Sequence, residues 1–169
     1  MKYVTSAAEF SSDRRYRYSL TRIWDRKAPM LLVCGLNPSK AGAADDDQTV
    51  RKWVGFGERL KYGGFIAVNL FAWIATRPAE LGQAARCSHD IIGPLNDLTL
   101  FGEAARADRI IVCWGVQPYP GRAAVALKLM NNPEGPRKFW CWGLTKDGHP
   151  RHPLRLAYAT PLQRFKVAG

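Results

Sequence analysis

The sequence predicts a single α/β domain with a three-layer α/β/α architecture, in which helices cover both faces of a central, mainly parallel four-stranded sheet. Four short apolar runs are continuous rather than alternating, as in strands buried on both faces. Segments of helical character separate them, and parallel neighbours require such crossover connections. The length of 169 residues suits one domain, expected to span residues 1–169 with its core at 30–156.

Each of the four apolar runs is rich in β-branched or aromatic residues and ends in a polar turn. The expected strands are 30–36 (MLLVCGL), 65–71 (FIAVNLF), 109–115 (RIIVCWG) and 138–144 (KFWCWGL). Their composition predicts four parallel core strands.

The segment 46–64 predicts the first helix. Aspartates at its start suit a helix amino terminus, and Gly63-Gly64 suits its end. Its apolar residues fall on one stripe, which consists of Val50, Trp53, Val54, Gly57 and Leu60.

Two further helices are expected at 96–108 and 121–132. In the first, Asn96 or Asp97 is the expected cap. Its expected core-facing residues are Leu98, Phe101 and Ala105. Residues 76–97 are expected to form a loop with at most one short helical turn.

The segment 15–24 (RYRYSLTRIW) alternates apolar and polar residues. Tyr16, Tyr18 and Leu20 would face one side, and Arg15, Arg17 and Ser19 the other. This period predicts an amphipathic edge strand or hairpin arm.

The composition points to a basic globular protein. Twenty-five Lys and Arg residues outnumber 14 Asp and Glu residues, for a net charge of +11 and a pI near 9.9. This charge favours a polyanionic partner such as DNA, although a basic enzyme without a nucleic-acid partner fits it equally well. We expect a cytoplasmic chain, monomeric by default and without a membrane partner, because no apolar run approaches about 20 residues and no secretion signal is evident. Four singly spaced cysteines indicate neither a zinc nor an iron–sulfur site, and no cofactor is expected.

Polar elements follow all four expected strands. They are Asn37-Pro38-Ser39, Asn69, Trp114-Gly115 and, beyond the fourth strand, His149-Pro150-Arg151-His152-Pro153. The carboxyl ends of parallel strands meet at one rim of the sheet, so these residues are expected to line one crevice. Taken singly, Asn-Pro-Ser also suits a strand-ending turn, and a His beside Pro also suits a surface or capping position.

These elements carry a resemblance to a known superfamily. The segments 35–39 (GLNPS), 68–71 (VNLF), 110–124 (IIVCWGVQPYPGRAA) and 148–154 (GHPRHPL) resemble, in order, the motifs of the uracil-DNA glycosylase superfamily. The whole chain is also similar to a bacterial and phage family of unknown function, whose members share Arg-Tyr-x-Leu, Leu-Asn-Pro-Ser, Asp-Asp-x-Thr, Val-Asn-Leu and His-Pro-Leu.

The glycosylase resemblance implies a uracil-DNA glycosylase-like fold and hydrolysis of the N-glycosidic bond to a modified or mismatched pyrimidine. Asn37 would orient a water at C1′ of the sugar. His152, or His149 in the other frame of the doubled His-Pro motif, would stabilise the departing base anion.

The same resemblance implies residues that bind the extruded base and the DNA. Asn69 would read the base edge and Phe71 or Trp73 would stack on its face, with Ser39 nearby. The residues expected to contact DNA are Lys40, Arg151, Leu154 and Arg155.

The sequence departs from the glycosylase pattern in two places. Asn37 stands where the most active branch has an Asp, so a slower or narrower enzyme is expected. Asp45, Asp46 and Asp47 have no glycosylase counterpart; they suit a helix cap, a divalent cation or catalytic carboxylates. If the aspartates point into the crevice, they favour a second function, a hydrolase or transferase acting on free nucleotides or nucleosides. A third is a non-catalytic binder of flipped or single-stranded bases.

Overall fold

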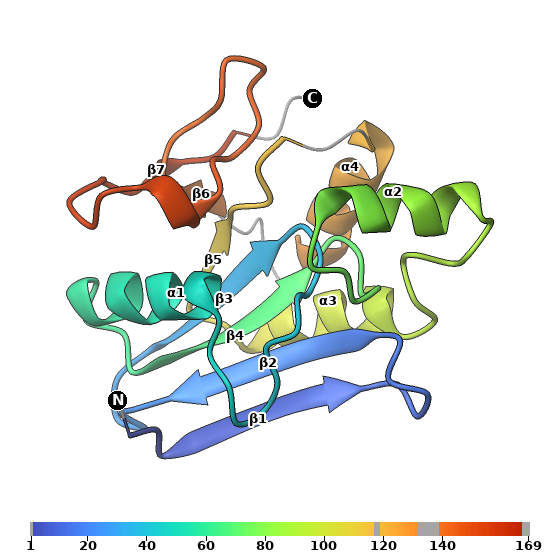
Figure 1. Cartoon of the computed structure of the whole chain (residues 1–169). Coiled ribbons are helices and arrows are strands. Elements are labelled where there is room, and N and C mark those ends of the chain that lie inside the picture. Colours follow the sequence, from blue (N-terminus) through green and yellow to red (C-terminus); the bar gives the residue numbers. More distant parts are fainter. Residues whose placement is uncertain (1, 117–118, 132–138, 167–169) are drawn as a thin grey trace.

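The computed structural model describes residues 2–116, 119–131 and 139–166, which form a mixed α/β fold (Figure 1). Seven strands make one sheet in the order β1-β2-β4-β3-β5-β6-β7. The strands are β1 (Thr5–Phe10), β2 (Arg17–Ile23), β3 (Met30–Gly35), β4 (Gly64–Asn69), β5 (Arg109–Val112), β6 (Phe139–Cys141) and β7 (Gln163–Arg164). The helices are α1 (Gln48–Arg59), α2 (Pro78–Arg86), α3 (Asn96–Arg106) and α4 (Pro120–Met130), with a short 3₁₀ helix η1 (Pro153–Arg155).

The four predicted strands form as β3, β4, β5 and β6, and these pair in parallel with their neighbours. Three antiparallel pairings flank them, through β1 and β2 on one side and β7 on the other. The chain therefore forms a mixed seven-stranded sheet rather than the four-stranded, mainly parallel sheet that the sequence predicted.

The amino-terminal segment forms a hairpin arm, one of the two predicted alternatives. Strand β2 is not at the edge, however, because it pairs with both β1 and β4. The expectation of a solvent-facing polar side is also wrong, because Arg17 and Ser19 are buried, as is Arg22 further along the strand. Residues 41–45 cover the two arginines, and their backbone carbonyls accept hydrogen bonds from the guanidinium groups.

Helices cover both faces of the sheet, and each face has its own core. On one face, α1 packs its predicted stripe against Leu31, Val33 and Ile111. Phe56 of α1 also stacks on Trp142, with ring centroids 4.4 Å apart. On the opposite face, α2, α3 and α4 pack against the alternate strand residues Leu32 and Cys34. Figure 1 shows α1 and α3 on opposite sides of the strands.

Helix α3 forms where it was expected but presents a different face to the sheet. Leu98 and Phe101 are 69% and 41% exposed, whereas Leu100 and Ala104 are fully buried. Asn96 explains the rotation: it is itself buried, and its amide donates to the carbonyls of Asn69 and Leu70 at 3.2 and 3.1 Å. Residues spaced four apart from Asn96 therefore face the core.

Helix α2 lies in the segment that was expected to be mostly loop. Pro78 occupies its first turn, where a missing N–H costs nothing. The Glu80 carboxylate accepts hydrogen bonds from the backbone N–H groups of Thr76 and Arg77, which completes the start of the helix.

Some predictions fall outside the described residues, namely positions 117 and 118 of the motif at 110–124, position 132 of the expected helix at 121–132 and position 138 of the fourth expected strand. Within the described ranges, no helix combines the length and apolar character needed to cross a membrane.

Candidate functional site

A pocket of about 390 Å³ lies at the carboxyl ends of the parallel strands. The strand register aligns these ends, since Gly35 of β3 pairs with Asn69 of β4 and Cys34 pairs with Val112 of β5. Its volume lies within the roughly 300–1,000 Å³ of small-molecule sites. Its polar and aromatic lining residues are Arg17, Asn37, Ser39, Asp47, Thr49, Trp53, Asn69, Thr76, Trp114 and His152.

Asn37 and Ser39 reach the pocket from the turn that follows β3. The Asn37 amide nitrogen donates to the carbonyls of Ala75 and Pro38 at 2.8 and 3.0 Å. The Ala75 N–H in turn donates to the Pro38 carbonyl, which ties this turn to the segment after β4. With both amide hydrogens engaged, Asn37 keeps its side-chain oxygen as an acceptor.

Asn69 ends β4 and lines the pocket while being only 2% exposed. Its neighbour Gly35 makes room for it, because a Cβ at that glycine would lie 2.8 Å from the Asn69 side-chain oxygen. The buried Asn96 amide and the Arg122 guanidinium bind the carbonyls at this strand end. These contacts fix the backbone at the end of β4, and the side-chain amide of Asn69 lines the pocket.

His152 comes to the pocket from a loop more than a hundred residues away in sequence from the Asn37 turn. The Gly115 N–H donates to the Pro150 carbonyl at 2.8 Å, and Gly115 adopts φ +72°, a conformation that favours glycine. The His152 ring nitrogen Nδ1 accepts from the Leu154 N–H at 3.4 Å, which leaves Nε2 to carry the proton of a neutral ring. Desolvation lowers the pKa of His152, although the residue keeps an exposed side at the rim, and the Asp47 carboxylate opposes part of this lowering.

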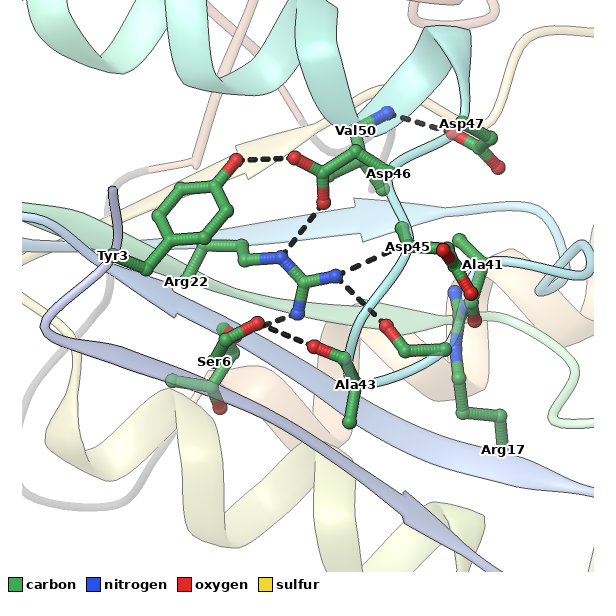
Figure 2. A network of polar contacts seen from close by, with 12 residues as sticks. Tyr3, Ser6, Arg17, Arg22, Ala41, Ala43, Asp45, Asp46, Asp47 and Val50 are labelled. Carbon is green, nitrogen blue, oxygen red and sulfur yellow. Dashed lines mark hydrogen bonds and ion pairs between the residues drawn. The ribbon is translucent and has the colours of Figure 1, made fainter. Parts of the chain in front are cut away.

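The three consecutive aspartates have three different environments (Figure 2). Asp46 pairs with the fully buried Arg22 at 2.8 Å and accepts a hydrogen bond from the Tyr3 hydroxyl. Burial and this bond to Asp46 raise the pKa of Tyr3 to about 12. Asp45 is exposed, and its backbone carbonyl accepts a hydrogen bond from Arg22.

Asp47 is the N-cap of α1 and also lines the pocket. One carboxylate oxygen accepts from the Val50 N–H at 2.8 Å, and the other accepts from the Ser39 hydroxyl. The predicted helix cap is thus confirmed for Asp47. The metal alternative is not supported, since the described residues contain no group of three or more metal-binding side chains and the aspartates diverge.

Sequence reasoning missed four of the polar and aromatic residues that line the pocket, namely Arg17, Thr49, Trp53 and Thr76. The strand pattern predicted a solvent-facing Arg17, and the helical stripe predicted a core position for Trp53; Trp114 was expected at the crevice as a strand-end residue. Among the described residues, Arg17 Nε, Asn69 Nδ2 and Trp114 Nε1 are buried donors without a hydrogen-bond partner. Such groups are rare in folded proteins, and a ligand or an ordered water that enters the pocket can supply their acceptors.

Three residues expected in the site lie elsewhere. Phe71 is buried in the core against Tyr119, with ring centroids 5.0 Å apart. Trp73 packs edge-on against Tyr16 and stacks on His89. His149 lies in a hairpin closed by Thr145, whose hydroxyl accepts from the His149 N–H. The two histidine frames are equivalent as sequence patterns. The structure distinguishes them, because His152 lines the pocket and His149 is not among the lining residues.

Three of the four expected DNA-contacting residues line a second groove of about 290 Å³ beside the pocket. Arg151, Arg155 and Leu154 line this groove, and Leu154 and His152 belong to both cavities. Lys40 is exposed on the loop that follows Ser39 and lines neither.

A family model described as a protein of unknown function (DUF1643) matches residues 17–154. The chain belongs to this family. The prediction of a family of unknown function is therefore confirmed, and the DUF1643 match covers all residues that line the pocket, from Arg17 to Leu154. Neither a curated protein nor a solved structure matches the chain.

Proposed function

We propose that this DUF1643 chain binds a nucleobase in the strand-end pocket and hydrolyses the N-glycosidic bond of a modified or mismatched pyrimidine in DNA. The observation that carries the proposal is the convergence of Asn37, Asn69 and His152 on one pocket, from three distant parts of the sequence.

Each of the three side chains has a suitable free atom. The unpartnered Asn69 Nδ2 donates to a base carbonyl, which fixes the base. The free oxygen of Asn37 accepts a hydrogen bond from the attacking water. The Nε2–H of a neutral His152 donates to the negative charge that develops on the departing base.

The surroundings suit a flipped base and its backbone. The indole rings of Trp53 and Trp114 on the pocket wall, in place of Phe71 and Trp73, offer planar surfaces to an extruded base. The adjoining groove carries Arg151 and Arg155, which suit backbone phosphates, and Leu154 lines both cavities. The net charge of +11 adds a general attraction to DNA.

A test uses end-labelled oligonucleotides that carry uracil, a thymine mismatch or hydroxymethyluracil, in single-stranded and duplex form. After incubation with the protein, hot alkali is expected to cut at the modified position because it cleaves abasic sites. Intact strands across the whole panel would contradict the proposal.

One observation favours the second function, a hydrolase or transferase of free nucleosides or nucleotides. The Asp47 carboxylate lines the pocket, where it repels phosphates and accepts hydrogen bonds from sugar hydroxyls. Turnover of nucleosides or nucleoside monophosphates, with no abasic product in the oligonucleotide panel, would select this function. Binding without either product would select a non-catalytic base binder.

Gly35→Ala is expected to weaken binding of the free base about tenfold or more, because the new methyl group displaces the Asn69 amide, and one hydrogen bond to a buried group is worth about 1–3 kcal/mol. Quenching of Trp53 and Trp114 fluorescence measures the affinity. Gly42→Ala is the control, since a Cβ there meets nothing within 4 Å. Equal affinity in both variants would show that Asn69 does not read the ligand.

A further inference from the structure

Asp47 is the sole carboxylate among the described residues that line the pocket. The ion pairs of the described chain engage Asp13, Asp46, Glu80, Asp97 and Glu103, and Asp47 is in none of them. Asp47 therefore has no direct ion-pair partner among the described residues, although the Arg17 guanidinium in the same pocket interacts with its charge.

Hydrogen bonds fix the Asp47 carboxylate but leave part of its acceptor capacity free. Its two oxygens accept from the Val50 N–H and the Ser39 hydroxyl, so the group cannot rotate freely. Each carboxylate oxygen has two lone-pair sites, and one on each remains for a ligand or a water. The neighbouring Asp46 differs, because its carboxylate pairs with the Arg22 cation and is not among the residues that line the pocket. Figure 2 shows the two side chains turned in different directions.

A second, independent observation concerns the buried donors that line the pocket in front of Asp47. Arg17 and Trp114 are each 3% exposed and Asn69 is 2% exposed, and each contributes an unpartnered buried donor to the lining of this same pocket. A ligand that accepts hydrogen bonds from these donors would occupy the cavity that Asp47 also lines.

We propose that Asp47 is a catalytic carboxylate that activates the attacking water; this inference rests on the proposed function. The bond between C1′ and the base nitrogen breaks, and its electron pair leaves with the base. The water oxygen bonds to C1′ while one water proton passes to the Asp47 carboxylate. The Asp47 proton then returns to solvent and the base anion takes up a proton, so that one water is consumed and an abasic sugar and a free base are released.

A catalytic Asp47 would supply the carboxylate that the first motif lacks, since Asn37 stands where the most active glycosylase branch has an Asp. Asn37 has no negative charge, so it orients the water but does not stabilise the cationic sugar of the transition state. Asp47 supplies that charge from the other side of the turn, where Ser39 links the two residues. A general base of this kind contributes about 10²–10⁴-fold to a rate.

The decisive variant is Asp47→Asn, compared with wild type in single-turnover cleavage of the panel oligonucleotide that the wild type cuts, starting with deoxyuridine. Asn is as good an N-cap as Asp, so the helix start is retained and the unfolding midpoint stays within a few degrees. The cleavage rate is expected to fall at least about 100-fold, with the affinity for the free base unchanged within a few-fold. Asp45→Asn is the charge-matched control, because its exposed carboxylate lies outside the pocket.

Asp47→Ser gives a second readout, since Ser is also a favourable N-cap and is shorter. Added formate is expected to restore part of the rate to Asp47→Ser and not to change the Asp45→Asn variant. A rate within about fivefold of wild type in Asp47→Asn, or no rescue by formate, would overturn the inference alone. A wild-type protein that cuts nothing in the panel would overturn both the inference and the proposed function.

Discussion

Replacing Arg22 with methionine is expected to lower the free energy of unfolding by about 3–5 kcal/mol, the cost of breaking a buried ion pair from one side. Arg22 is completely buried, and its guanidinium donates to the Asp46 carboxylate and to the carbonyls of Thr21, Gly42 and Asp45. Methionine fills the space but leaves these acceptors without a donor. Urea unfolding followed by Trp fluorescence measures the change.

Two comparisons sharpen this prediction. Arg22→Lys is also expected to destabilise, because one ammonium does not reproduce the fork of a guanidinium that binds several acceptors. Arg15→Met removes an exposed ion pair with Asp13 and is expected to leave the unfolding curve almost unchanged. An Arg22→Met protein as stable as wild type would show that other contacts hold the segment at 41–47.

The same network links the amino-terminal hairpin to the site. Figure 2 shows the segment 41–47 lying across β2, with the Ser6 hydroxyl bonded to the Ala43 carbonyl and the Arg17 guanidinium to the Ala41 carbonyl. This segment ends at Asp47, so its anchoring on β2 decides where the pocket carboxylate lies. The amino-terminal hairpin therefore helps to position Asp47 in the pocket.

This network also explains which part of the fold the sequence could not predict. The parallel strands were predictable because continuous apolar runs of this length are typical of strands buried on both faces. The alternation of Arg15, Arg17 and Ser19 with apolar residues indicated a solvent-facing side, whereas Arg17 is buried under the folded-back segment, as is Arg22. The burial of a charged side chain depends on acceptors that are distant in sequence, here the carbonyls at 41, 42 and 45 and the carboxylate of Asp46.

The site was predictable to the extent that it follows from strand ends. Asn69 ends β4, Asn37 lies in the turn after β3, and His152 lies in the loop after β6. Their convergence follows from the topology, because the carboxyl ends of parallel strands meet at one edge of the sheet. Trp53 reaches the pocket because α1 docks over the sheet, and the rotation of α3 depends on the buried Asn96, which a simple apolar period does not reveal. Trp53, which helix packing brings to the pocket, was therefore missed, as was Arg17 of β2, whereas Asn37, Asn69 and His152 were predicted from the ends of the parallel strands.

His152→Ala is expected to slow cleavage by about 10²–10³-fold, the usual cost of removing one donor that stabilises a developing anion. The affinity for the free base should change little, because Asn69 and the indole rings supply the binding contacts. His149→Ala is the matched control, since that ring belongs to the neighbouring hairpin, and its rate should equal that of wild type. Loss of activity in His149→Ala with a normal rate in His152→Ala would reverse the assignment of the two frames.

The pH dependence of the rate tests which form of His152 acts. Burial lowers the pKa of His152 below its ordinary 6.5, with Asp47 opposing, so the neutral ring persists as the pH falls through that value. The rate should therefore stay level near pH 6.5 and fall only at more acidic values.

The same lowered pKa makes stability depend on pH. Because the unfolded chain takes up this proton first, the contribution of His152 to stability declines as the pH drops below 6.5. Titration of the ring by NMR in wild type and in Asp47→Asn measures the pKa, and the variant is expected to have the lower value because it lacks the opposing carboxylate. A rate that rises as His152 becomes protonated would show that the imidazolium, rather than the neutral Nε2–H donor, meets the departing base.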